Sequence, residues 1–141
     1  MMKKLMYMWW VLGLISISLA LTVSAQDTAK VAVAAPFDQV VAAIKQGDVS
    51  SLTPYLDNTI EINITGKSNS YSKTQAEVIL KEFFSKNQVK SFELVHQGEG
   101  GGGSRFGIGN MNTATGAFRT YFLLQKKGSG MVLNELRFET K

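Results

Sequence analysis

Cysteine is absent from this 141-residue chain, and proline (two residues) and histidine (one residue) are scarce. Without cysteine the chain has no disulfide, no thiolate nucleophile and no cysteine-ligated zinc or iron–sulfur site. A zinc site of the usual kind needs several histidines, and His96 is alone. We therefore expect no metal and no cofactor, and a fold stabilised by packing.

Charge of one sign is not concentrated in this sequence either. Lys and Arg number 15 and Asp and Glu number 11, a net charge of +4 that includes two lysines near the N-terminus. Most other lysines alternate with acidic or polar residues, as on an ordinary solvated surface. Nucleic-acid binding requires a concentrated basic face. We therefore predict no nucleic-acid partner.

The one long hydrophobic run lies near the N-terminus. Two lysines precede an apolar run from Leu5 to Leu21, and residues 23–25 (Val-Ser-Ala) provide the small residues that signal peptidase recognises. We predict a signal peptide over residues 1–25; an uncleaved anchor is the alternative, because the run lies at the lower limit for a span. A lipid-anchored bacterial lipoprotein needs a cysteine just after its signal peptide, and Gln26 occupies that position. We therefore expect a soluble periplasmic or secreted protein without membrane contact after cleavage.

Helical periodicity follows a flexible leader expected over residues 26–35, within a single domain over 36–141. Pro36 suits a helix start and Gly47 a left-handed end, and Asp48 can cap a second short turn. Ser72 and Gln75 form a capping box for a long helix to about Ser85. The apolar stripes of the first and long helices are Phe37, Val40, Val41 and Ile44, then Ala76, Ile79, Leu80 and Phe83.

Strict alternation of apolar and polar residues predicts five strands, at residues 59–65, 91–97, 105–111, 117–126 and 131–139. Residues 66–70 read as a polar loop, and Asn87 as a left-handed helix stop. Alternation places His96 on the same face as Phe92 and Leu94. Short turns between the last four strands predict an antiparallel meander. Helices stacked on one face of this sheet give an α+β two-layer domain.

Several segments together resemble a known superfamily. The Gly47-Asp48 helix end, the acidic turn at Asp57-Asn58 and the IEINI strand resemble the nuclear transport factor 2-like (cystatin-like, SnoaL-like) superfamily. More closely, the chain is similar to small exported bacterial proteins of unknown function within it. The resembling segments are SKTQAEVILKEFF (72–84), KSFELVHQG (90–98), FGIG (106–109), GAFRTYFLL (116–124) and LRFE (136–139).

The resemblance implies an open cone, in which a curved sheet wraps the long helix and the mouth can hold a small ligand. Enzymes of the superfamily set an Asp, His or Tyr inside the cone, whereas other members bind small molecules or pair with partners. Fold analogy alone does not choose among these activities. The candidate pocket residues are His96, Tyr55, Tyr121 and Arg119, and none is assigned a catalytic role.

The segment GEGGGG (98–103) matches GxGxxG literally, but a dinucleotide site requires a helix after it. Strand-like residues follow instead, so we interpret it as a hairpin loop. The leading hypothesis is non-enzymatic binding of a small molecule or protein partner, with a homodimer through the sheet. The alternatives are an isomerase- or dehydratase-like enzyme using His96, and a structural accessory domain of the cell envelope.

Overall fold

The computed structural model describes residues 25–141, and the predicted signal peptide lies outside them except for Ala25. The helical elements are α1 (Ala25–Gln46), α2 (Val49–Leu52), a 3₁₀ turn (Thr53–Tyr55), α3 (Lys73–Lys86) and a second 3₁₀ turn (Gly101–Gly103). The strands are β1 (Leu56–Ile64), β2 (Lys67–Ser72), β3 (Val89–Glu99), β4 (Arg105–Thr113), β5 (Gly116–Lys127) and β6 (Gly130–Thr140). Within these residues, no helix combines the length and apolarity needed to span a membrane.

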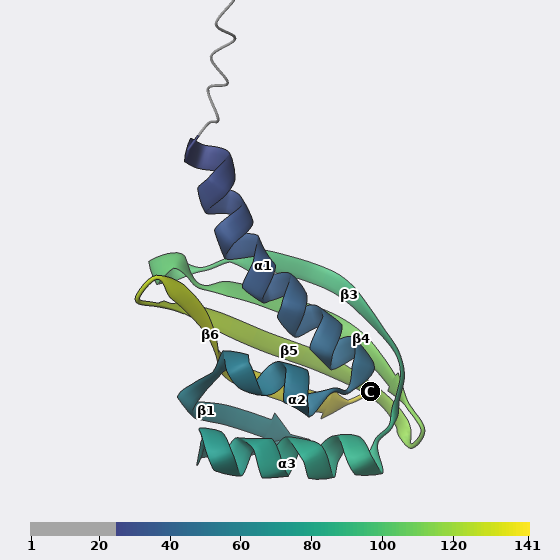
Figure 1. Cartoon of the computed structure of the whole chain (residues 1–141). Coiled ribbons are helices and arrows are strands. Elements are labelled where there is room, and N and C mark those ends of the chain that lie inside the picture. Colours follow the sequence, from purple (N-terminus) through teal and green to yellow (C-terminus); the bar gives the residue numbers. More distant parts are fainter. Residues whose placement is uncertain (1–24) are drawn as a thin grey trace, which may run out of the picture.

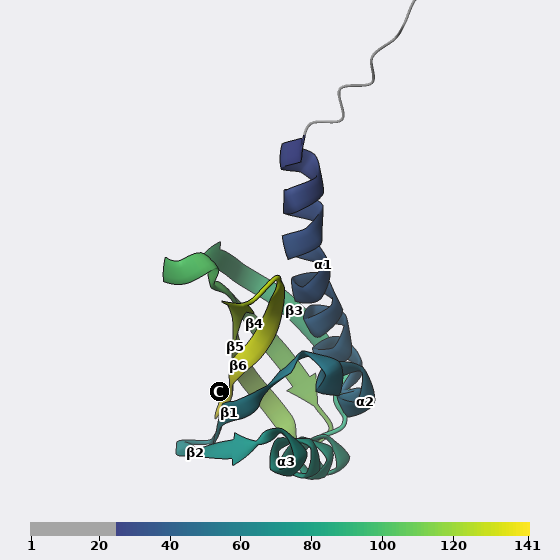
Figure 2. The same ribbon diagram turned by 60° about the vertical axis from the view of Figure 1, so that its left-hand side comes forward.

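One curved sheet holds all six strands in the order β2-β1-β6-β5-β4-β3. The predicted antiparallel meander of β3 to β6 is confirmed, and β1 joins it by parallel pairing with β6. The three helices lie on one face of the sheet (Figures 1 and 2). There α1 packs against β3, whereas α3 packs against β1 and β2. The α+β architecture expected from the sequence is therefore present.

Aromatic rings fill the concave face under α1. The ring of Phe37 on α1 lies 5.3 Å from that of Phe122 on β5, and both side chains are buried. Gly107 and Gly109 on β4 let rings lie directly on the strand: a Cβ on Gly107 would meet Phe122 at 2.3 Å, and one on Gly109 would meet Phe92 at 2.3 Å. This part of the cone is packed solid.

The start of α1 differs from the prediction. We expected a leader over residues 26–35 and a helix from Pro36, but α1 already begins at Ala25. The segment AQDTAKVAVAA is rich in alanine, the best helix former. This propensity extends the helix before Pro36, which lies inside α1 instead of starting it.

Three further predictions about local structure are wrong. The segment expected as a polar loop is mostly strand β2, paired with β1. β1 begins at Leu56, so the expected turn at 57–58 lies within it. Asn87 has φ −122° instead of a left-handed angle, and its amide Nδ2 caps α3 by donating to the Phe83 carbonyl. The Gly47 stop is confirmed by its φ of +62°.

The predicted face of His96 is also wrong, because β3 has a bulge. The register between β3 and β4 shifts between Leu94 and His96. A bulge inserts one residue and so reverses which face the following side chains occupy. Phe92 is buried on the helix side, whereas His96 is exposed on the opposite, outer face of the sheet.

Candidate functional site

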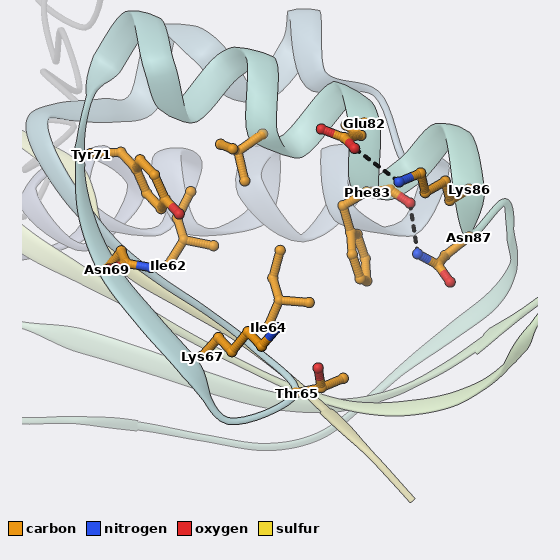
Figure 3. A pocket seen from close by; sticks show the side chains of 11 residues that line it. Ile62, Ile64, Thr65, Lys67, Asn69, Tyr71, Glu82, Phe83, Lys86 and Asn87 are labelled. Carbon is orange, nitrogen blue, oxygen red and sulfur yellow. Dashed lines mark hydrogen bonds and ion pairs between the residues drawn. The ribbon is translucent and has the colours of Figure 1, made fainter.

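A cavity of about 370 Å³ opens between α3 and the β1–β2 hairpin (Figure 3). It lies at the β1–β2 end of the sheet, away from the packed aromatic rings of β4 and β5. Its floor is apolar, and its rim carries amides, a hydroxyl and charged groups. The lining residues are Ile62, Ile64, Thr65, Lys67, Asn69, Tyr71, Ile79, Glu82, Phe83, Lys86 and Asn87.

Strand β2 forms one wall of this cavity, because its alternate side chains point toward α3. Lys67, Asn69 and Tyr71 pair in register with Ile64, Ile62 and Ile60, the residues of β1 that face the helices. Successive side chains of a strand point to opposite faces. The three β2 side chains therefore face α3, and the serines between them face away.

The turn between β1 and β2 sets this register. Thr65 and Gly66 form a two-residue connection with φ values of +50° and +87°. Positive φ at both positions is the requirement of a type I′ hairpin turn. Gly66 meets it without cost, and its N–H donates to the Asn63 side chain at 3.1 Å. Thr65 is β-branched and therefore strained in this conformation, and it lies on the cavity rim.

Helix α3 forms the opposite wall. The predicted capping box at its start is confirmed: the Ser72 Oγ accepts from the Gln75 N–H, and the Gln75 side chain accepts from the Ser72 N–H. Farther along, the Phe83 ring stacks on that of Phe138 with 4.1 Å between centroids. Ile79 is only half-buried because it faces the cavity instead of the core.

The rim of the cavity is polar and slightly basic. Lys86 pairs with Glu82 at 2.9 Å, and this contact lowers the pKa of the Glu82 carboxyl, which stays ionised. Lys67 takes part in none of the ion pairs found among residues 36–141. Asn87 is occupied by structural hydrogen bonds to Phe83 and Thr115. One lysine charge on this rim is therefore uncompensated.

The candidate residues selected from the sequence lie elsewhere. His96, Tyr121 and Arg119 are on the outer face of the sheet, where the Phe106 ring neighbours both His96 (5.6 Å between centroids) and Tyr121 (6.3 Å). Tyr55 lies on the helix side, packed partly into the core. The structure thus brings His96 near Tyr121 but separates both from Tyr55.

The surroundings of Tyr121 perturb its titration. Partial burial raises the pKa of its phenol, and the charge of Glu135 adds to the shift. The Arg137 guanidinium lies 5.5 Å from the Tyr121 ring centroid and pairs with Glu135. The Tyr121 phenol is therefore a neutral group on this face at neutral pH.

The residues that line the cavity were missed because β2 was interpreted as a loop. The available signal was the alternation of Lys67, Asn69 and Tyr71 with three serines. Among residues 36–141, no three His, Asp or Glu side chains gather closely enough to hold a metal ion. The glycine-rich segment connects β3 to β4, as expected for a hairpin loop.

Comparison with known proteins places the chain in a family. Residues 37–139 match the model of the domain of unknown function DUF4783. A DUF4783 protein from Bacteroides uniformis ATCC 8492 is 33% identical, with a TM-score of 0.70 over 74% of this chain and 95% of that one. One from Bacteroides fragilis YCH46 is 32% identical, with a TM-score of 0.69 over 73% and 96%.

More distant structures share the fold. A nuclear transport factor 2-like protein of unknown function from Shewanella baltica OS155 is 12% identical, with a TM-score of 0.59 over 82% of this chain and 95% of that one. No curated protein matches the sequence. The resemblance inferred from the residues is thus confirmed. The chain belongs to the DUF4783 family and has the nuclear transport factor 2-like fold.

Proposed function

We propose that this protein is exported and binds a small molecule without transforming it, in the cavity between β2 and α3. The cavity carries the proposal. Its volume of about 370 Å³ falls in the range of small-molecule sites, which are mostly apolar with a few polar groups that fix orientation. Ile62, Ile64 and Phe83 provide the apolar contact, and Asn69 and Tyr71 provide polar groups on the rim.

Native mass spectrometry of the protein purified from its own host tests this proposal. We expect an adduct of defined mass on the wild-type protein. Ile79→Trp places a larger side chain in the cavity and should abolish the adduct. Val95→Trp is the matched control, because Val95 is 51% exposed on β3, the opposite edge of the sheet. An adduct retained equally by both variants, or no adduct on the wild type, would overturn the proposal.

The outer face of the sheet supports a second proposal, a homodimer. The half-buried side chains of Phe106, Ile108, Tyr121 and Leu123 form an apolar centre there. Charges of both signs surround it, including the Arg137–Glu135 pair. A two-fold dimer places a surface against itself, so mixed charge permits self-association where a single sign would oppose it.

Light scattering at high protein concentration tests the dimer. The wild-type protein should have the mass of two chains, and Ile108→Glu should have the mass of one. Lys90→Glu, an exposed change on β3, serves as the control and should remain dimeric. A wild-type protein that stays monomeric at high concentration would rule this interface out.

A further inference from the structure

The two ends of the β2–α3 cavity differ in chemistry. Figure 3 shows Lys67, at the start of β2, on one wall of the cavity and Lys86, near the end of α3, on the facing wall. We call the part of the cavity between these two lysines its basic end. The other end, where β2 leads into α3, carries Tyr71 and Ile79. A ligand that matches both ends has one polar and one apolar end.

A second cavity continues the apolar end. It measures about 300 Å³ and is lined by Tyr71, Thr74, Gln75, Val78 and Ile79. Tyr71 and Ile79 line both cavities, so the two meet at these side chains. Val78, in the lining of this second cavity, is 61% exposed. A flexible chain lying past Tyr71 would cover it.

The basic end favours an anion. Glu82 already pairs with Lys86, whereas Lys67 joins none of the ion pairs found over residues 36–141. The carbonyl of Phe83, near the negative end of the α3 dipole, accepts from Asn87 and so does not face a ligand unsatisfied. An oxygen anion placed here would gain charge-assisted hydrogen bonds from lysine.

We propose that the ligand is a soluble single-chain amphiphile with a carboxylate head, such as a fatty acid. Its head lies at Lys67, and its tail crosses the apolar floor and passes Tyr71 to Val78. This inference rests on the proposed small-molecule function and specifies the ligand class. A free amphiphile fits better than a bilayer surface, because the large apolar side chains exposed on residues 36–141 are Val78 and Val95, which lie on separate elements. Such isolated side chains do not make a membrane-binding patch.

Calorimetric titration with dodecanoate, dodecanol and dodecyltrimethylammonium tests the head group, with the two ionic probes kept below their critical micelle concentrations and dodecanol below its solubility limit. Dodecanoate should bind most tightly. Lys67→Glu should weaken dodecanoate about fivefold, the effect of losing and then reversing one exposed charge contact. Lys90→Glu changes net charge equally on another strand and should leave the affinity unchanged. If Lys67→Glu and Lys90→Glu weakened dodecanoate binding equally, the loss would come from the change in net charge. That result would overturn the placement of the carboxylate head at Lys67.

Chain length tests the tail. Val78→Asp should weaken dodecanoate about threefold by removing apolar contact, and should leave hexanoate unaffected because a short chain ends before Tyr71. An equal loss for both acids would overturn the path over Val78. The side chains of Lys67 and Val78 are exposed, so neither Lys67→Glu nor Val78→Asp should unfold the protein. Matching circular dichroism spectra of both variants and the wild type check this.

The remaining outcomes separate this inference from the proposed function. If dodecanol bound as tightly as dodecanoate and Ile79→Trp abolished this binding, the proposed anionic head group would be wrong. A small molecule would still bind in the cavity. Absence of binding by all three probes, together with a host-derived adduct lost in Ile79→Trp, would overturn the amphiphile alone. Binding to phosphatidylglycerol vesicles without binding of monomeric dodecanoate would overturn the soluble ligand in favour of a lipid surface.

Discussion

The two ends of the curved sheet differ in how fully side chains fill the space between the sheet and the helices. At β4 and β5, glycines allow the rings of Phe92 and Phe122 to lie directly on the strand, and the concave face is filled. At β1 and β2, the strand residues facing α3 are isoleucine, asparagine, lysine and tyrosine, and a cavity of about 370 Å³ remains. The same fold thus closes its cone at one end and leaves an opening at the other.

This difference shows that the nuclear transport factor 2-like fold does not by itself place a pocket. Ring size and backbone clearance decide where the space between sheet and helices stays empty. A Cβ at Gly107 or Gly109 would collide with a ring, so these glycines are part of the packing. At the open end the rings of Tyr71 and Phe83 line the cavity without filling it, and the other β2 side chains that face α3 are polar.

Truncation should have unequal costs at the two ends. Phe122→Ala removes a fully buried ring at the filled end and should lower the free energy of unfolding by about 3–5 kcal/mol. Ile79→Ala removes a half-buried side chain that already faces empty space, so its cost should be about 1 kcal/mol. Urea denaturation measures both. Equal costs would show that the open end is packed as tightly as the filled end.

Adding a methyl group to the filled end should also be destabilising. Gly109→Ala places a Cβ 2.3 Å from the Phe92 ring and 2.8 Å from the Glu93 carbonyl, and overpacking of this kind costs about 1–3 kcal/mol. Combining it with Phe92→Leu should recover part of the loss, because the ring is removed. The double-mutant cycle is read from urea denaturation. A double variant whose losses simply add would show that ring and glycine do not interact.

The sequence predicted local features of the fold better than features that depend on strand pairing. Periodicity, the Ser72–Gln75 capping box and the left-handed Gly47 are local signals, and the structure confirms them. Two features that depend on strand pairing could not be predicted from the pattern of apolar and polar residues. The β3 bulge moved His96 to the outer face, and pairing with β1 made a strand of residues that looked like a loop. The cavity depends on that second strand, so its residues were missed.

Relief of strain in the β1–β2 turn should stabilise the open end. Thr65→Asn keeps a hydrogen-bonding side chain but adopts positive φ more readily, and should raise the free energy of unfolding by about 1 kcal/mol. The matched variant Thr59→Asn, on β1 with an exposed side chain, should not stabilise the protein. Thermal denaturation compares the two. A Thr65→Asn variant no more stable than the wild type would show that the hairpin already accommodates threonine without strain.

The smallest expected effect concerns an ion pair that links the two ends. Asp57 on β1 pairs with Lys127 on β5 at 2.8 Å, and this hydrogen bond holds the pKa of the Asp57 carboxyl below its ordinary value. A lowered folded-state pKa stabilises the protein above the unfolded value, and this stabilisation is lost as pH falls through the folded-state value. Lys127→Met should therefore cost about 0.5 kcal/mol at neutral pH, as for other exposed ion pairs. Wild type and variant should converge below the folded-state pKa of Asp57, in the strongly acidic range, when urea denaturation is repeated across pH. A difference that persists there would assign the effect to the packing of the Lys127 side chain instead of to its charge.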